Sequence, residues 1–167
     1  MPRLQFEQWL PFSVERVFAF FSNPENLPLL MPAATQTRLD DLKRVPPPNA
    51  SPESNDKAAG VGSVLFTSFR VLPFLPFRRR WIARITEFEW NRYFADVQDE
   101  GPFQSWRHRH EFTSASKDGR PGTTIRDVID YEVGFGALGA IANALFVTRQ
   151  LQSTFAQRQK RLPELLG

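Results

Sequence analysis

The chain of 167 residues contains no cysteine and only two histidines. Without cysteine, the sequence excludes disulfide bonds, thiolate catalysis and cysteine-ligated zinc sites. Long hydrophobic runs are also missing, since no stretch approaches the roughly 20 apolar residues of a membrane span. The first residues, MPRLQFEQWLPF, lack the apolar core and small-residue cleavage site of a signal peptide. We therefore expect a cytoplasmic protein.

The composition is that of a soluble globular protein, with 41% hydrophobic and 23% charged residues. The length fits a single domain over 1–167 that buries a substantial core. Sixteen phenylalanines indicate either a thick core or an apolar cavity. The net charge of +3 is compatible with anionic ligands, membrane headgroups or nucleic acid, although such charges most often form a solvated face.

Local patterns predict the elements of the first third of the chain. Apolar and polar residues alternate over 3–10, which predicts a strand. Ser13 is a natural N-cap for a helix, and Asn23 with Pro24 predicts the start of a second, short helix. Residues 40–60 include three consecutive prolines and many small polar residues, which predicts a mobile surface loop.

Beyond this loop, alternation returns in five segments, and glycine or proline separates some of them. They predict a meander of antiparallel strands at 61–72, 79–90, 92–99, 104–115 and 122–133. From about Gly136 to Leu162 the apolar residues recur at helical spacing instead, which predicts one long helix. A long helix against a curved antiparallel sheet is an α+β arrangement, and we expect a cavity between the two.

The two histidines lie in the stretch GPFQSWRHRHEF, within the predicted strand 104–115. Side chains alternate across a strand, so one face carries arginines and a glutamate and the other carries the histidines between two aromatic residues. The charged face has to lie outside. We therefore expect four side chains to point inward, namely Trp106, His108, His110 and Phe112.

The neighbouring strands add further inward candidates by the same alternation. Asp127 and Tyr131 are expected to face inward on 122–133, and Trp81 on 79–90. Strand 92–99 is ambiguous. Its more apolar face carries Tyr93, Ala95 and Val97, so the pattern alone places Asp96 and Gln98 outside.

Several roles are open to this inward polar patch. It is a structural hydrogen-bonded group, a ligand-recognition site or a proton-transfer site. Two histidines with Asp127 also imitate a two-histidine, one-carboxylate metal face, but the chain supplies no further obvious ligand. We therefore predict no metal site and no cofactor.

Larger stretches resemble a known family. SVERVFAFFSNPENLPLLMP, the spaced residues around Trp81, the segment from Phe94 to Phe112, GTTIRDVIDYEV and the long C-terminal helix are similar to the START-related helix-grip (SRPBCC) superfamily. The nearest branch is the polyketide cyclase/dehydrase-like group of bacterial ligand-binding proteins. The resemblance implies the helix-grip fold: a curved antiparallel sheet of about seven strands around a long C-terminal helix, two short helices after the first strand, and a deep hydrophobic cavity. It also groups Phe94, Asp96 and Gln98 with the inward histidines.

We thus expect a protein that binds a small hydrophobic molecule, such as a lipid, polyketide, quinone or aromatic compound, in an internal cavity. One alternative is a cyclase or dehydratase that uses the cavity histidines and aspartates. Another is a lipid or quinone chaperone that contacts a membrane through 71–80. Nucleic-acid binding is not expected. The predicted cavity residues are Trp81, Phe94, Asp96, Gln98, Trp106, His108, His110, Phe112, Asp127, Tyr131, Leu138, Ile141 and Leu145.

Overall fold

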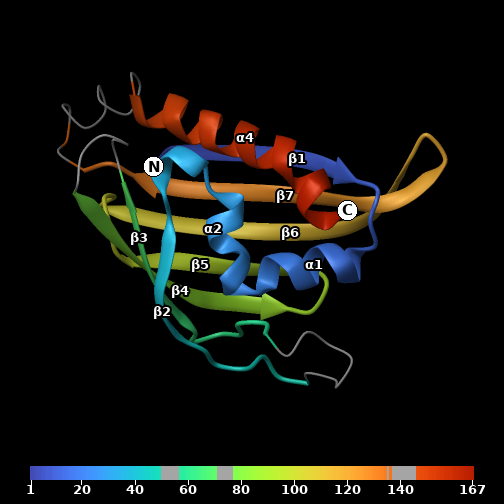
Figure 1. Cartoon of the computed structure of the whole chain (residues 1–167), viewed down its shortest axis with the longest axis horizontal. Coiled ribbons are helices and arrows are strands. Elements are labelled where there is room, and N and C mark those ends of the chain that lie inside the picture. Colours follow the sequence, from blue (N-terminus) through green and yellow to red (C-terminus); the bar gives the residue numbers. More distant parts are fainter. Residues whose placement is uncertain (50–56, 71–76, 135, 137–145) are drawn as a thin grey trace.

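The computed structural model describes residues 1–49, 57–70, 77–134, 136 and 146–167. Within this part of the chain, seven strands form one antiparallel sheet in the order β1-β7-β6-β5-β4-β3-β2 (Figure 1). The strands are β1 (Arg3–Leu10), β2 (Arg38–Lys43), β3 (Val64–Arg70), β4 (Arg78–Glu89), β5 (Tyr93–Glu100), β6 (Ser105–Lys117) and β7 (Arg120–Glu132). The pairings from β3 to β7 form the predicted meander, and β1 extends it by pairing with β7.

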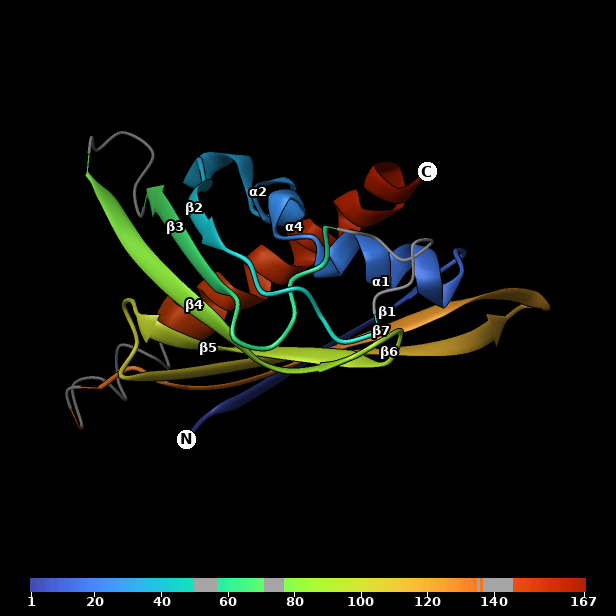
Figure 2. The same ribbon diagram turned by 90° about the horizontal axis from the view of Figure 1, so that it is seen from below.

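The helices lie on one face of the curved sheet (Figure 2). They are α1 (Val14–Ser22), the 3-10 helix η1 (Pro24–Asn26), α2 (Leu27–Leu30), the 3-10 helix η2 (Ala33–Thr35) and α4 (Thr148–Leu166). This is the helix-grip arrangement that the resemblance implies. None of the described helices is long and apolar enough to cross a membrane.

The caps that the sequence predicts begin the short helices. The Ser13 hydroxyl accepts a hydrogen bond from the Arg16 amide, and α1 then turns Val17, Phe18 and Phe21 into the core. The Asn23 side chain accepts from the Glu25 amide at the start of η1. Capping satisfies amides that the first helical turn leaves without partners.

The prediction of a surface loop over 40–60 needs correction at both ends. Residues 40–43 belong to β2, an edge strand that the sequence pattern did not indicate. At the other end Ala58 and Ala59 are buried, and the Ala59 amide donates to the Ser22 carbonyl. The hydrophobic pattern did not indicate this packing, because the buried residues are small and the contact to Ser22 is made by the backbone. Residues 50–56 lie outside the described part of the chain, so the predicted mobility remains a prediction.

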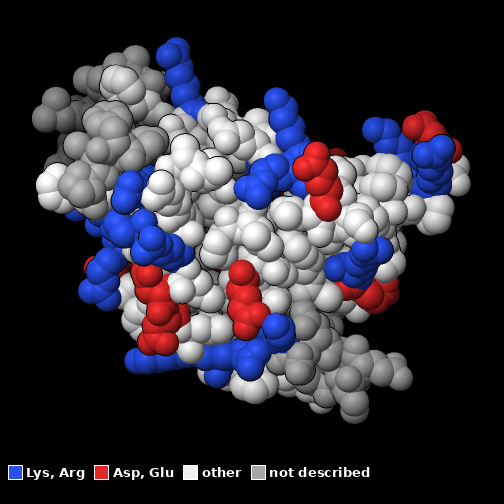
Figure 3. All heavy atoms as spheres, viewed as in Figure 1, with Lys and Arg blue, Asp and Glu red and all other residues white. Residues whose placement is uncertain are grey.

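Charges on the outer face of the sheet are paired. Arg84 binds Asp99 at 2.8 Å, and Arg107 and Arg109 both bind Glu87. Arg126 lies 3.4 Å from Glu7. Figure 3 views the opposite side of the molecule, where the helices lie, and shows basic and acidic side chains next to each other there as well. The outward arginines therefore do not stand as an unopposed basic strip.

The inner face carries two apolar clusters. In the larger one, below α1, Phe18 packs edge-to-face against Phe88, Phe94 and Phe112 with ring centroids 5.1–6.0 Å apart. The second lies below α4 and is built from Trp106, Ile129, Tyr131 and Phe155 with partly buried neighbours. Between the two clusters lies a group of polar side chains.

Candidate functional site

A row of polar side chains from β6, β7 and α4 lies between the two apolar clusters. On β6, His108 and His110 lie between Trp106 and Phe112. On β7, Asp127 lies between Ile125 and Ile129. On α4, Arg158 lies between Phe155 and Leu162. The four polar side chains are His108, His110, Asp127 and Arg158, and all are buried.

One oxygen of Asp127 is the centre of this group. His108 Nε2 lies 3.0 Å and Arg158 Nη2 3.1 Å from Asp127 Oδ1. His110 Nδ1 lies 2.7 Å from the same oxygen, but its direction does not make a hydrogen bond. The β6–β7 register places His110 directly opposite Asp127, which explains this close contact. We refer to these four residues as the Asp127 cluster.

Arg158 was missed by sequence reasoning. Its guanidinium lies over the rings of Phe21, at 4.6 Å, and Phe155, at 5.1 Å, as it reaches Asp127. Such contacts stabilise a cation away from water. A signal was present, because Arg158 follows Phe155 by three positions and precedes Leu162 by four, which puts it on the apolar stripe of the helix. A charged residue on such a stripe requires a buried partner.

Burial and neighbouring charges shift the pKa values of Asp127 and His110. Burial alone raises the pKa of Asp127, yet Arg158 and the two histidines hold that pKa well below its ordinary value. Burial, together with the adjacent His108, lowers the pKa of His110 to about 3. At neutral pH Asp127 is therefore ionised and His110 is uncharged.

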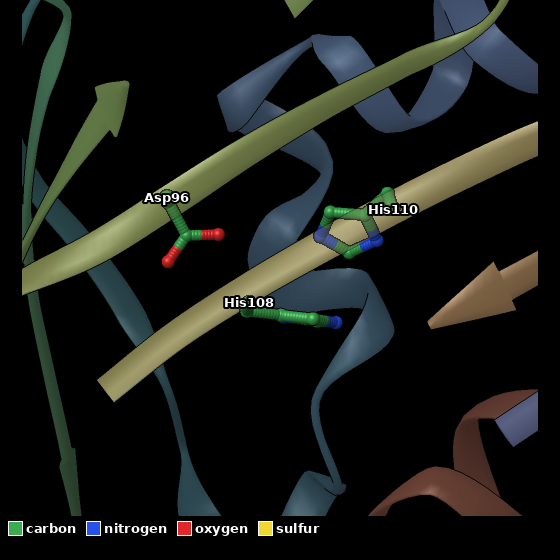
Figure 4. Close-up of side chains that lie close together, drawn as sticks. All are labelled: Asp96, His108 and His110. Atoms are coloured by element: carbon green, nitrogen blue, oxygen red, sulfur yellow. The ribbon is translucent and has the colours of Figure 1, made fainter. Parts of the chain in front are cut away.

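Asp96 lies beside the Asp127 cluster without joining it. It is opposite His108 in the β5–β6 pairing, and Figure 4 shows the three side chains of Asp96, His108 and His110 close together. Burial raises the pKa of Asp96 to about 6, against the opposing effects of His108 and Arg158. Among the described residues, none donates a hydrogen bond to its carboxyl group, which stays partly accessible.

The orientation of β5 corrects the interpretation drawn from alternation alone. Phe94 and Asp96 lie on the inner face, opposite His110 and His108, as the resemblance implies. Gln98 is half-buried, and its side-chain amide donates to the Phe103 carbonyl at 2.8 Å. Tyr93 instead packs under the outer Arg109 guanidinium at 3.8 Å. The prediction from alternation was wrong because it assigned the more apolar face of β5 to the interior and the face with the Asp96 carboxylate to solvent.

Three of the aromatic candidates, Trp81, Trp106 and Tyr131, form a continuous group at the α4 end of the inner face. Trp106 lies 5.0 Å from Trp81 and 6.2 Å from Tyr131, centroid to centroid. Phe103, which the sequence analysis did not single out, lies 4.9 Å from Trp106. Trp81 and Phe103 are only half-buried. The remaining candidates, Leu138, Ile141 and Leu145, lie outside the described residues.

The donor set of Asp96, His108 and His110 brings one ligand atom from each residue within 4.8 Å of the others. A divalent cation holds each donor atom at about 2 Å, so two of its donors lie no more than about 4 Å apart. The adjacent Arg158 guanidinium is held at Asp127 and opposes a second cation. The prediction of no metal site stays a prediction, with this repulsion as its physical reason.

A pocket of about 260 Å³ lies on the opposite, outer face of the sheet. Its lining comes from β1, β6 and β7, namely Glu7, Glu111, Thr113, Ala115, Thr124 and Arg126. Arg126 already pairs with both glutamates there, at 3.4 and 3.9 Å. This pocket is therefore separate from the inner polar and aromatic groups.

Comparisons with known proteins agree with the fold. A Thermus thermophilus protein of known structure is 18% identical, with 99% of this chain and 97% of that chain covered and a TM-score of 0.64. A Chromobacterium violaceum protein is 14% identical over 98% and 96%, with a TM-score of 0.68. The norcoclaurine synthase of Thalictrum flavum, in complex with dopamine and hydroxybenzaldehyde, is 18% identical over 96% and 85%, with a TM-score of 0.59.

No curated protein matches the chain. The family model described as polyketide cyclase / dehydrase and lipid transport, however, matches residues 10–160. That match runs from the last residue of β1 through the short helices and the strands β2 to β7 to most of α4. The chain therefore belongs to the polyketide cyclase / dehydrase and lipid transport family.

Proposed function

We propose that this protein is a single-domain binder of a small hydrophobic or aromatic molecule, held between the inner face of the sheet and α4. The observation that carries the proposal is the incomplete burial of inner-face groups at the α4 end. Trp81, Asp96 and Phe103 point to the side covered by helices, yet all three remain half-buried. Apolar surface left open inside a fold is what a ligand covers, at about 25 cal/mol per Å².

The two ends of the inner face differ in this respect. Below α1, Phe18, Phe94 and Phe112 are buried against one another, and the partly exposed Phe88 and Trp90 pack at their margin. Below α4, Trp106 and Tyr131 are buried, and Trp81 and Phe103 contact them but keep exposed surface. We place the ligand at the α4 end because the half-buried Trp81 there contacts Trp106, which leads to His108, so that the Asp127 cluster and Asp96 form its polar boundary.

Native mass spectrometry of the purified protein tests this proposal through a co-purified small molecule, together with titration of the neutral fluorescent probe N-phenyl-1-naphthylamine. We expect Trp81→Leu to weaken probe binding at least several-fold. Trp9→Leu is the matched control, because Trp9 lies on β1 with its indole bound to Ala115 at the outer edge. A protein that carries no small molecule and binds no probe contradicts the proposal.

An enzyme of the cyclase or dehydratase type is the second candidate. It is favoured by two carboxyl groups on one face whose pKa values are moved apart, Asp96 upward to about 6 and Asp127 downward. Such separation is typical of an acid and a fixed anion that act together. Turnover that is lost in Asp96→Asn while ligand affinity is retained distinguishes this candidate from a binding protein.

A lipid or quinone chaperone is a third candidate on the same fold. The described part of the 71–80 segment contributes Phe77, which is 74% exposed, next to the arginines that begin β4. An exposed aromatic residue beside cations suits an anionic membrane surface. Sedimentation with phosphatidylglycerol vesicles, compared between the wild type and Phe77→Ser, tests it. Equal sedimentation of the two contradicts this contact.

A further inference from the structure

The inner face holds a carboxyl group, that of Asp96, which accepts no hydrogen bond from the residues that the structure describes. Asp127 has Arg158 at 3.1 Å and His108 at 3.0 Å. Asp96, on the neighbouring strand pair, has no hydrogen-bond donor among the described residues. Both aspartates lie beside His108, so proximity to that histidine does not explain why only Asp127 is hydrogen-bonded.

The nitrogen atoms of the cluster gather at Asp127, and two of them, on His108 and Arg158, are hydrogen-bonded to it. His108 Nε2, His110 Nδ1 and Arg158 Nη2 converge on the single oxygen Oδ1. None of these three atoms is left to bind Asp96. The charged groups that face Asp96 are thus His108 and His110 on β6, Asp127 on β7 and Arg158 on α4, and the cluster they form is already internally paired.

The hydrogen bonds of this cluster go to Asp127 and leave the Asp96 carboxyl group without a donor among the described residues. Asp127 and Arg158 cancel, and His110 is uncharged because burial holds its pKa at about 3. When Asp96 is ionised, its half-buried carboxylate has no hydrogen-bond donor among the described residues. A half-buried anion in this position is unfavourable until a hydrogen-bond donor reaches it.

The neighbourhood of Asp96 also indicates which kind of molecule would carry the hydrogen-bond donor. Beside His108 on β6, Trp106 lies 6.1 Å from the imidazole ring, and Trp81 lies 5.0 Å from Trp106. Flat apolar rings that begin two residues along β6 from His108, the residue paired with Asp96, suit an aromatic body that carries a donor group. They disfavour a ligand that presents only acceptors or a second carboxylate, because neither relieves the charge of Asp96.

We propose that Asp96 is the recognition group for a hydrogen-bond donor, a hydroxyl or a protonated amine, on an aromatic ligand. This inference rests on the proposed binding function and adds the chemistry of the ligand to it. Asp96 accepts the donor, the aromatic side chains cover the ring, and the Asp127 cluster stays intact as a fixed wall.

The test uses four naphthalene probes that differ in one group: 2-naphthol, 2-naphthylmethylamine, 2-methoxynaphthalene and 2-naphthoate. Isothermal titration calorimetry at pH 7.5 measures the dissociation constant of each for the wild type, Asp96→Asn and Asp99→Asn. Asp99 is the matched control, since it lies on the same strand but pairs with Arg84 on the outer face. Thermal unfolding of each variant verifies that it is folded.

We expect at least one of the two donor probes to bind the wild type about tenfold to hundredfold more tightly than the ether, which is typical of a hydrogen bond to a charged group. Asp96→Asn removes most of this preference, whereas Asp99→Asn keeps it. Titrations between pH 7.5 and 5 separate the two donors, because protonation of Asp96 abolishes the preference for the amine and only weakens that for naphthol.

The outcomes distinguish this inference from the proposed function. If the ether or the naphthoate binds as tightly as both donor probes, or if Asp96→Asn keeps the preference, the recognition role of Asp96 is overturned and the binding function stands. If no probe binds folded wild-type protein, the binding function and this inference fall together.

Discussion

Arg158 and Asp127 form an ion pair with Nη2 and Oδ1 at 3.1 Å, and each side chain is only 8% exposed. It joins α4 to β7 through the interior of the fold. A buried pair of this kind adds little net stability relative to well-packed apolar residues, but removal of one partner leaves the other charge without compensation.

Arg158→Met is expected to lower the free energy of unfolding by about 3–5 kcal/mol, because Asp127 then remains buried without its cation. Urea unfolding at pH 7 measures this loss. Arg149→Met on the exposed side of the same helix serves as the control and is expected to change stability by less than about 0.5 kcal/mol. Equal effects of the two substitutions contradict the structural role of Arg158.

The pKa of His110, lowered to about 3 by burial and His108, makes stability depend on pH. In the unfolded chain a histidine has a pKa of about 6.5, so between about 6.5 and 3 the unfolded state binds a proton that the native state does not. Stability is therefore expected to fall as pH falls through this window. His110→Phe keeps an aromatic ring beside Phe94 and removes this dependence.

Urea unfolding at pH 7, 6, 5 and 4 measures the effect of His110→Phe. Both proteins should carry Asp96→Asn, because Asp96 titrates in the same window with the opposite sign. The variant is expected to show the smaller decrease toward acid pH. Parallel curves for the two proteins contradict an uncharged His110 in the native state.

Asp96 is expected to limit stability at neutral pH. Burial raises its pKa to about 6, so its favourable contribution is present in acid and is lost as pH rises through 6. Asp96→Asn should therefore raise the free energy of unfolding at pH 8 by about 1–3 kcal/mol and leave it nearly unchanged at pH 4. Thermal melts at the two pH values, with Asp99→Asn as the control, check this. Destabilisation at pH 8 speaks against an unpartnered carboxylate.

The order of the main elements and the inner faces of β6 and β7 followed from the sequence, because period-two alternation is strong there. His108, His110 and Asp127 are buried as alternation predicts. The edge strand β2 was not predicted, because its six residues, RLDDLK, contain only two apolar side chains and gain their place by pairing with β3. Arg158 was not predicted because a cation on an apolar helix stripe is explained only by its partner on another element.

Gly60→Ala is expected to destabilise the fold by about 1–3 kcal/mol through overpacking. A Cβ atom at Gly60 would lie 2.6 Å from the Pro47 Cα and 2.7 Å from the Pro47 nitrogen, and backbone atoms do not move aside easily. Differential urea unfolding measures the loss. Gly119→Asn is the comparison, since no atom lies within 4 Å of a Cβ there and asparagine tolerates its φ of +75°. An unchanged urea midpoint for Gly60→Ala refutes the close packing of this segment.

Purified protein is expected to contain no stoichiometric metal, and zinc is not expected to raise its melting temperature. The reason is the Arg158 guanidinium, which occupies the anionic centre beside both histidines. Elemental analysis and thermal melts with and without zinc measure this. One equivalent of retained metal, lost on combined His108→Phe and His110→Phe substitution, reverses the conclusion.

The Asp127 cluster also favours the native register of β6 against β7. A slip of β6 by one residue exchanges its two faces and is opposed by the apolar pattern. A slip by two residues keeps both faces, so alternation offers no resistance to it. The native alignment alone brings His110 opposite Asp127 while Arg158 reaches the same oxygen. A two-residue slip that sets Phe112 against Asp127 takes the histidines away from that carboxylate. The buried ion cluster thus opposes a slip that hydrophobicity accepts.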